Sequence, residues 1–454
     1  MKLIYNVQDK PKFGQLIVFA IQQLLAIMAA TLVVPIIIGN GMQPNAALFG
    51  AGIGTLVYLL FTKFKSPVFL GSSFAFLGSM GAAFAGAATI ELGYLGLILG
   101  AILAGLVYVV IALIVKVAGT GWINKLMPAV VIGPTVAIIG LSLAGNAIGD
   151  LTGTEATYAA AEITTSPYVA LICGLVTLAV VTLCSTYGKK TLKLVPFIIG
   201  ILAGYVVAAI FTAIGFATGN DALKVIDFSF FGNLLPEGSV ALKTFFTLPE
   251  FTFLTALGGF ESIDGAYIGS IAMAYVPVAL VVFAEHIADH KNISSIIETD
   301  LLEEPGLHRT LLGDGVGSMA GAFFGGCPNT TYGESVACVA ITGNASVFTI
   351  LTAAVGAILI SFLSPFVAFV DSIPPCVMGG VCMALYGFIA VSGLKMLQKV
   401  NLEENRNLFT ASVILIAGIG GLSISFGQIT ITSIACALIL GILVNLLLSK
   451  KTAE

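Results

Sequence analysis

Long apolar runs alternate with short polar connections along almost the whole chain. The runs fall near residues 14–38, 46–62, 67–88, 94–118, 123–145, 167–186, 194–215, 266–289, 310–326, 328–343, 346–370, 374–394, 407–426 and 429–449. A helix needs roughly 20 mostly apolar residues to cross a bilayer. The pattern therefore predicts an all-α polytopic membrane protein with fourteen transmembrane segments, of which 310–326 and 328–343 are the shortest.

Positive charges test this count, because Lys and Arg concentrate on the cytoplasmic side of membrane proteins. With a cytoplasmic N-terminus, seventeen of the 19 Lys and Arg residues fall on that side, and only Lys224 and Lys243 fall on the other. The seventeen are Lys2, Lys10, Lys12, Lys63, Lys65, Lys116, Lys125, Lys189, Lys190, Lys193, Lys291, Arg309, Lys395, Lys399, Arg406, Lys450 and Lys451. The distribution predicts a multi-pass protein of the cell (inner) membrane with both termini in the cytoplasm.

The composition excludes several classes of protein. Of the 454 residues, 58% are hydrophobic and 9% are charged, against about 25% charged in ordinary soluble domains. So few charges exclude a disordered chain, a coiled coil and a nucleic-acid-binding protein. The seven cysteines lie in apolar stretches without any CxxC motif, which is typical of buried hydrophobic residues and not of a metal site. We expect one membrane transport domain over residues 1–454.

Short sequence matches indicate an internal repeat. PAVVIG (128–133) resembles PPCVMG (374–379), and these are the fifth runs of each half. The third runs of each half, SPVFLGSSFAF (66–76) and CPNTTYGESVAC (327–338), both begin near a proline and carry Gly and polar residues. An odd number of spans per half makes the halves insert with opposite topology. The pattern predicts 7+7 inverted repeats, at about 14–215 and 266–449, joined by a partly ordered extracellular loop at about 216–265.

The third apolar run of each half also predicts the position of a binding site. Pro and Gly discourage a continuous helix, so each run is expected to be a short extended segment that leads into a half-helix. Such breaks are tolerated where the backbone lines an enclosed cavity, and paired breaks indicate a transporter site.

Four acidic residues fall within the apolar runs, where a carboxylate costs several kcal/mol, and three of them, Glu285, Asp289 and Glu334, suggest a common site. Glu285 and Asp289 are four residues apart and share one helix face, and Glu334 lies in the second break. Burial and mutual repulsion prevent three close carboxylates from all staying ionised, so one is expected to hold a proton, as a proton-coupled carrier requires. Carboxylates accept N–H bonds, and half-helix N-termini offer N–H groups to carbonyl oxygens. A small neutral ring such as a nucleobase, or another cyclic amide or imide, fits this combination of carboxylate acceptors and backbone N–H donors.

Other titratable residues receive structural interpretations. His286 points about 100° away from Glu285 on a helix, which favours packing or an interfacial position. His290 is expected near the cytoplasmic end of the eighth span. Asp314 is expected to act as a helix N-terminal charge, and Asp371 to border an outside loop.

Taken together, the motifs resemble the nucleobase–ascorbate transporter family, also called nucleobase–cation symporters, and most of all its uracil-carrying bacterial branch. They are GSSFAF (71–76), AGTGW (118–122), AEH (284–286), EPGLHR (304–309), PNTTYGE (328–334), AIT (340–342) and VMGGV…LYG (377–387). The resemblance implies proton-coupled uracil uptake without a cofactor or metal, and an often dimeric fold. It also implies a core of spans one to four and eight to eleven, and a gate of spans five to seven and twelve to fourteen.

The resemblance also implies roles for particular residues. Glu285 would accept the ring N–H edge, with the proton shared with Asp289, and Glu334 would bind from the other half-helix. Backbone groups at Phe74 and Gly333 would meet the carbonyl oxygens, and Phe74 would pack on the ring. The neighbouring Ser73 and, from the gate, Tyr386 would complete the pocket.

Alternatives stay open at this point. Asp289 resembles the purine branch of the family, which carries xanthine and urate, whereas Glu334 resembles the uracil branch. An anion exchanger on the same fold is a further candidate, but Glu285 and Glu334 would repel an anion. An enzyme is not expected, because the sequence contains no recognisable nucleophile–base pair, metal cluster or phosphate-binding loop.

Overall fold

The computed structural model describes residues 3–153, 165–189, 191–232, 234–235, 239–426 and 429–449. Among the cations counted above, Lys2, Lys190, Lys450 and Lys451 lie outside the described residues. In the described part, eight helical stretches are long and apolar enough to cross a membrane. They are α1 (Phe13–Ile38), α2 (Pro44–Phe61), α4 (Ile90–Ala118), α6 with α7 (Ala129–Ser142 and Ala144–Thr152), α8 (Pro167–Tyr187), α10 (Pro196–Thr218), α14 (Gly265–Ile297) and α19 (Pro375–Leu397). The chain is therefore a mostly helical, multi-pass membrane protein.

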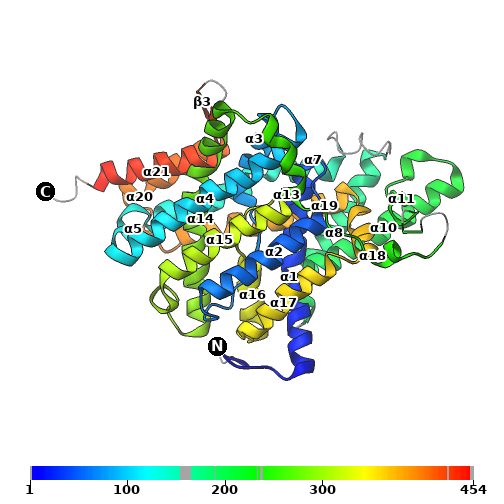
Figure 1. Ribbon diagram of the computed structural model, residues 1–454, viewed down its shortest axis with the longest axis horizontal. Coiled ribbons are helices and arrows are strands. Elements are labelled where there is room, and N and C mark those ends of the chain that lie inside the picture. The colour runs from blue at the N-terminus through cyan, green and yellow to red at the C-terminus, as the bar shows by residue number, and fades with distance from the viewer. Residues whose placement is uncertain are drawn as a thin grey trace.

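Shorter elements fill the space between these helices (Figure 1). The apolar ones are η1 with α3 (Phe74–Phe76 and Leu77–Ala85), α16 (Gly333–Thr342), α17 (Val347–Ile360), α20 (Asn405–Ile419) and α21 (Ser433–Ser449). The remaining helices near the spans are α5 (Gly121–Leu126), α9 (Thr191–Leu194), η5 (Leu302–Gly306), α15 (Leu307–Gly325) and α18 (Ser364–Asp371). The predicted loop 216–265 contains η2 (Asp221–Leu223), α11 (Ser229–Gly232), α12 (Leu242–Phe245), α13 (Thr252–Ala256) and η4 (Leu257–Glu261).

Several predicted spans have different boundaries in the structure. The run 346–370 is two helices, α17 and α18, because Pro365 in the first turn of α18 cannot continue the hydrogen bonding of the preceding helix. The run 266–289 is too short, since α14 continues to Ile297. Parts of the last two runs form an antiparallel hairpin, β3 (Ile424–Phe426) with β4 (Ile429–Ile431), whose β-branched residues favour strands.

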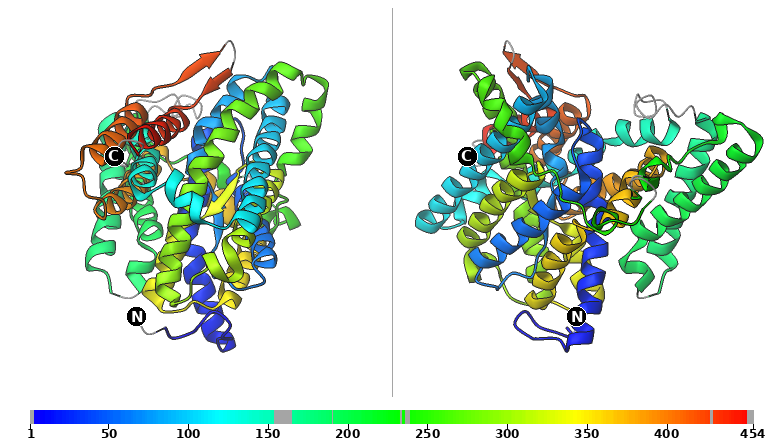
Figure 2. Two further views of the ribbon diagram at one scale, coloured as in Figure 1. Left: turned by 90° about the vertical axis from the view of Figure 1, so that its left-hand side faces the viewer. Right: turned by 45° about the vertical axis from the view of Figure 1, so that its right-hand side comes forward.

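The helices pack in two groups. In one group, α15 packs against α2 and α4, α14 against α4, and α17 against α1 and α2. In the other, α19 packs against α6, α7 and α8, α10 against α8, and α20 against α6 and α21. In the right-hand view of Figure 2, α8 and α10 of the second group lie to the right of the first group, and the red C-terminal helix α21 lies on its left.

Small residues bring α2 and α15 into close contact. Gly50 and Gly54 of α2 face Gly317, Gly321 and Gly325 of α15, each set repeating every fourth residue. A Cβ atom on Gly54 would lie 2.8 Å from the carbonyl oxygen of Gly317. Such stripes let membrane helices approach until their backbones touch, because no side chain separates them.

The N-terminal segment lies across one end of the first group, at the bottom of Figure 2. The Gln8 amide donates to the Phe64 carbonyl oxygen (2.6 Å), and the Ser346 hydroxyl donates to the Asp9 carbonyl oxygen (2.6 Å). The exposed Lys65 follows Phe64 directly and pairs with Glu304. This pairing lowers the pKa of the Glu304 carboxyl group. The connections after α2 and after α14 therefore lie at the same end of the molecule as the N-terminus.

Candidate functional site

Two short strands cross in the middle of the first helix group. β1 (Leu70–Ser72) pairs antiparallel with β2 (Asn329–Thr331), and β2 is the yellow strand at the centre of the left-hand view of Figure 2. Each strand leads directly into a short helix, η1 and α3 after β1, and α16 after β2. The two breaks predicted from sequence are confirmed. Because the strands are antiparallel, the N-termini of the two half-helices face the centre from opposite ends of the ladder.

A cavity of about 240 Å³ lies beside this crossing. Its wall combines residues of α14, β2, α16, α6 and α19, together with Phe74. The lining residues are Phe74, Val136, Glu285, Ala288, Asp289, Asn292, Thr330, Tyr332, Gly333, Glu334, Val336, Ala337, Phe388, Ile389 and Ser392. The cavity thus lies between the two helix groups, and a ligand in it would contact both.

The three intramembrane carboxylates meet in this cavity. Glu285 and Asp289 project from consecutive turns of α14, and Glu334 lies in the first turn of α16. The Thr331 hydroxyl donates to Asp289 Oδ2 (2.8 Å), so β2 holds this carboxylate in place. Among the described residues none of the three has an ion-pair partner, and no Lys, Arg or His lines the cavity. The site therefore favours N–H donors and protons over anions.

The N-terminus of α16 is suited to binding a ligand. The N-cap residue Tyr332 makes no side-chain cap hydrogen bond, so N–H groups of the first turn other than that of Glu334 stay available, and the helix dipole adds partial positive charge there. Behind it, the Ser335 hydroxyl accepts the Phe69 N–H (3.0 Å) and the Gln23 amide of α1. These bonds fix α16 to α1 and to the residue before β1, which positions the neighbouring Glu334.

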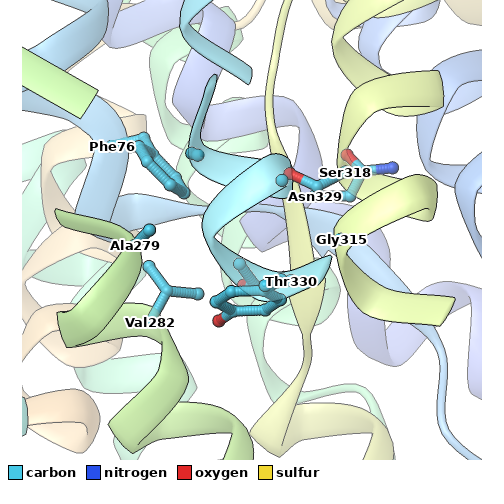
Figure 3. Close-up of a pocket in the computed structure, with 10 residues that line it drawn as sticks. Phe76, Ala279, Val282, Gly315, Ser318, Asn329 and Thr330 are labelled. Atoms are coloured by element: carbon cyan, nitrogen blue, oxygen red, sulfur yellow. The ribbon is translucent and has the colours of Figure 1, made fainter. Parts of the chain in front are cut away.

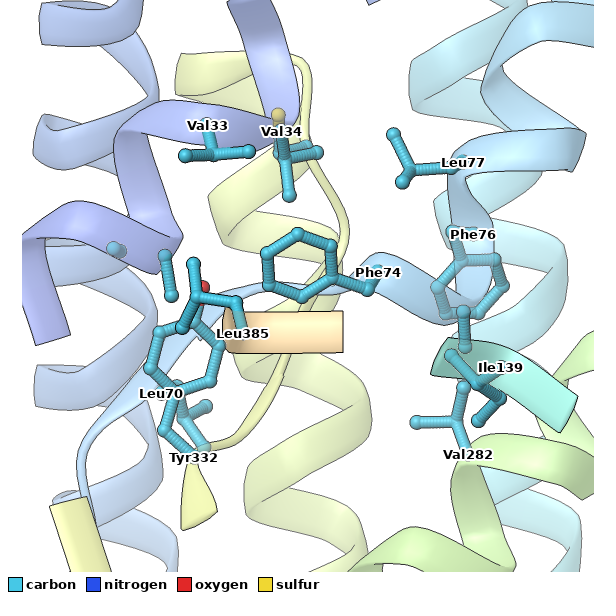
Figure 4. Close-up of a cluster of buried hydrophobic side chains, with 14 of the residues drawn as sticks. Val33, Val34, Leu70, Phe74, Phe76, Leu77, Ile139, Val282, Tyr332 and Leu385 are labelled. Atoms are coloured by element: carbon cyan, nitrogen blue, oxygen red, sulfur yellow. The ribbon is translucent and has the colours of Figure 1, made fainter. Parts of the chain in front are cut away.

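Of the other predicted site residues, Phe74 and Gly333 line the cavity, whereas Tyr386 and Ser73 lie behind its wall. The Phe74 ring packs edge-on against Tyr386 of α19, with ring centres 5.7 Å apart at 79°. Figure 4 shows Phe74 among buried hydrophobic side chains, with Leu70 of β1 and Leu385 of α19. Tyr386 is not among the lining residues and supports Phe74 from behind. Ser73 is buried and does not line the cavity either, and its N–H donates to the Pro328 carbonyl oxygen (2.9 Å).

Residues that the sequence did not single out also line the cavity. Tyr332 belongs to the PNTTYGE motif, and its hydroxyl donates to the Ser72 carbonyl oxygen (2.7 Å), which braces the two strands. Asn292 follows Glu285 by seven residues and so extends its helix face, a spacing that was readable from sequence. Phe388 and Ser392 come from α19, and only the packing of α19 against the first group brings them to the site.

Asp314 is not a helix N-terminal charge. It lies in the interior of α15, fully buried, and its Oδ2 is 2.6 Å from His286 Nδ1. His286 Nε2 lies 3.0 Å from the Thr310 hydroxyl, which itself donates to the Leu307 carbonyl oxygen. Nε2 must therefore carry the hydrogen. One proton remains for the bond between His286 Nδ1 and Asp314 Oδ2, which keeps the pair neutral in a medium where an unpaired charge is costly.

His290 is likewise buried inside α14 and not near its end. Its Nδ1 donates to the His286 carbonyl oxygen (2.8 Å), so its Nε2 accepts the Tyr58 hydroxyl (2.7 Å). Tyr58 in turn accepts the Ser66 hydroxyl (2.6 Å). The two imidazole rings stack with centres 3.9 Å apart. This network joins α14 to α2 and α15 on the face opposite Glu285, and so fixes the orientation of the site-bearing helix.

A second cavity, drawn in Figure 3, is too small for an organic ligand. Its volume is about 10 Å³, room for roughly one water molecule. Ser318 and Asn329 line it from α15 and β2, and Thr330 is shared with the larger cavity. The 240 Å³ cavity, in which the three carboxylates meet, is therefore the candidate site for a substrate.

A family model described as "Permease family" matches residues 14–427. Uracil permease of Bacillus caldolyticus is 39% identical over 451 residues, which cover 98% of this chain and 95% of that protein. The chain belongs to the permease family. Uracil permeases of Bacillus subtilis (strain 168) and Escherichia coli (strain K12) are 38% and 36% identical to this permease and cover 100% and 97% of it. The chain is thus a transporter and not an enzyme.

Solved structures show the same fold. The transmembrane domain of the cyanobacterium bicarbonate transporter BicA superposes with a TM-score of 0.61 at 15% identity, covering 97% of this permease and 99% of that domain. The murine anion transporter Slc26a9 superposes with a TM-score of 0.63 at 12% identity, covering 98% of this permease and 70% of that chain. At this identity the likeness concerns the fold alone.

Proposed function

We propose that this permease takes up uracil across the cytoplasmic membrane by proton symport. The observation that carries the proposal is the meeting of Glu285, Asp289 and Glu334 in one cavity between two opposed half-helix N-termini. The full-length similarity to uracil permeases supports the substrate.

The proposed binding mode follows from the chemistry of the wall. Uracil presents two N–H groups and two carbonyl groups at its edge. Glu285 and Glu334 accept the N–H groups, and backbone N–H groups at Gly333 and Phe74 meet the carbonyl oxygens. Phe74, supported by Tyr386 and flanked by Ser73, packs against the ring.

The proposed coupling uses the same carboxylates. A proton from outside neutralises Glu285, with Asp289 one turn away able to share it. Neutralisation lowers the cost of closing a dry cavity around a neutral base. Deprotonation toward the cytoplasm restores the charge and releases the base.

The proposed architecture has fourteen spans in 7+7 inverted repeats. The third element of each half is a strand followed by a short helix, β1 with η1 and α3, and β2 with α16, which supports the repeat. We assign α1–α4 and α14–α17 to the core and the other spans to the gate, as the two packing groups suggest. We place both termini in the cytoplasm, and we propose that the permease forms a homodimer.

Two other substrates deserve a test. Asp289 favours a purine such as xanthine or urate, since the resembling purine carriers have an acid at this position. An anion is disfavoured, although the fold is that of anion transporters, because no basic side chain lines the described cavity.

Uptake of labelled uracil into proteoliposomes, with and without an inward proton gradient, tests the proposal. We expect gradient-driven accumulation that excess unlabelled xanthine does not inhibit. Uptake that ignores the gradient would refute proton symport, and strong inhibition by xanthine would move the substrate to the purines.

A further inference from the structure

One stripe of α14 lines the candidate cavity, and the exposed residue of this stripe is Asn292. Glu285, Ala288, Asp289 and Asn292 repeat at helical spacing and all line it, over about 10 Å of helix. Glu285 and Ala288 are half-buried and Asp289 is 8% exposed, whereas Asn292 is exposed. The mouth of the cavity therefore lies on the Asn292 side of the carboxylates.

The opposite side of the mouth is formed by α19. Phe388 and Ser392 are one turn apart, both are exposed, and both line the cavity. The Phe388 ring packs edge-on against Phe197 of α10, with centres 5.8 Å apart at 70°. This contact holds the ring as a fixed aromatic surface at the mouth, although 52% of the residue is exposed.

The chemistry of the mouth differs from that of the inner site. The Asn292 amide and the Ser392 hydroxyl are neutral, and each both donates and accepts hydrogen bonds. Neither side chain has a hydrogen-bond partner among the described residues. Together with an exposed aromatic face, such groups suit a planar base with N–H and C=O groups, since bases stack on aromatic rings.

We propose that Asn292, Phe388 and Ser392 form a second, release-side subsite for the base. The inference rests on the proposed function of nucleobase transport. The base leaves the carboxylates, stacks on Phe388 and exchanges hydrogen bonds with the two neutral groups before it enters water. The mouth lies toward the end of α14 where the connection to α15 carries Glu304, the partner of Lys65, and this is the end proposed to be cytoplasmic.

Substitutions in a subsite on one side of the membrane should change the KM for uracil entering from that side only. This asymmetry provides the test. Uracil transport is measured in right-side-out and inside-out membrane vesicles for the wild type, Asn292→Ala and Ser392→Ala. Gln398→Ala is the matched control, because Gln398 is an exposed amide on the same end of α19 and does not line the cavity.

We expect the KM for uracil entering from the cytoplasmic face to rise about three- to tenfold in both variants, the effect of one lost hydrogen bond. The KM from the outer face and both values for Gln398→Ala should match the wild type. Equal changes at both faces, or no change in either variant, would overturn the subsite. Absence of uracil transport by the wild type would instead refute the proposed function, so the two failures are distinguishable.

Discussion

Replacing Asp314 distinguishes two states of its buried pair with His286. In one, the two side chains form a neutral hydrogen bond; in the other, His286 carries a full charge that the Asp314 carboxylate balances. Because Thr310 fixes the hydrogen on His286 Nε2, Nδ1 needs either a donor or a proton of its own. In Asp314→Asn the side-chain amide can donate to Nδ1 in nearly the same geometry, so a neutral hydrogen bond replaces the shared proton. In Asp314→Ala the Nδ1 atom stays buried without a partner.

The magnitudes follow from these contacts. A net hydrogen bond contributes about 1 kcal/mol, and an unsatisfied buried group costs about 1–3 kcal/mol. We expect Asp314→Asn to lower the free energy of unfolding by about 1 kcal/mol or less. Asp314→Ala should lower it by about 3 kcal/mol, once the lost packing of a fully buried side chain is added.

Equilibrium unfolding of the purified permease in mixed detergent micelles measures both values. Glu403→Ala, at an exposed position in the connection before α20, serves as the control and should match the wild type. A large loss in Asp314→Asn, equal to that in Asp314→Ala, would refute the neutral pair. It would show that His286 carries a full charge that only a carboxylate can balance, since an unpaired buried charge costs about 3–5 kcal/mol.

Three further substitutions test the site and the packing. Glu285→Gln should abolish proton-driven uracil accumulation in proteoliposomes, and full accumulation by this variant would exclude Glu285 as the coupling group. Thr331→Val removes the hydrogen bond to Asp289 and should raise the KM for uracil about two- to tenfold, whereas an unchanged KM would show that β2 does not position this carboxylate. Gly54→Val forces side-chain atoms against the α15 backbone and should destabilise the protein by about 1–3 kcal/mol or more, seen as loss of the monodisperse peak in size-exclusion chromatography. Gly14→Ala meets no atom within 4 Å and should keep that peak, and an equally stable Gly54→Val would contradict the close packing of α2 and α15.

Much of the site was predictable because each of its elements is determined by a short stretch of sequence. Proline and glycine near 66–76 and 327–338 break the helix wherever they lie, so the two strands and half-helices follow from the residues themselves. The spacing of Glu285 and Asp289 places them on one face of any helix. The contribution of α19 was not predictable, because nothing local to Phe388 or Ser392 indicates which helix they will face.

Some spans were predicted with the wrong boundaries for a related reason. An apolar run indicates that a segment prefers lipid or a protein interior. The hydropathy of such a run does not distinguish one long helix from two short helices. The run 346–370 therefore read as one span, although Pro365 begins a new helix. The hairpin of β3 and β4 was missed because its Ile and Phe residues continue the apolar runs on either side, and pairing needs the partner strand.

By itself, the sequence determined the membrane class, the helical composition, the two breaks and the carboxylates, since each depends on the solvation or backbone geometry of a short segment. Only the tertiary structure decided what those segments meet. The glycine stripes allow α2 and α15 to touch, and the approach of α14 to α15 turns Asp314 from a surface charge into the buried partner of His286. The second helix group closes the wall of the cavity with residues about 100 to 150 positions away from Glu285. These pairings depend on how complete helix surfaces fit together, which no short stretch of sequence contains.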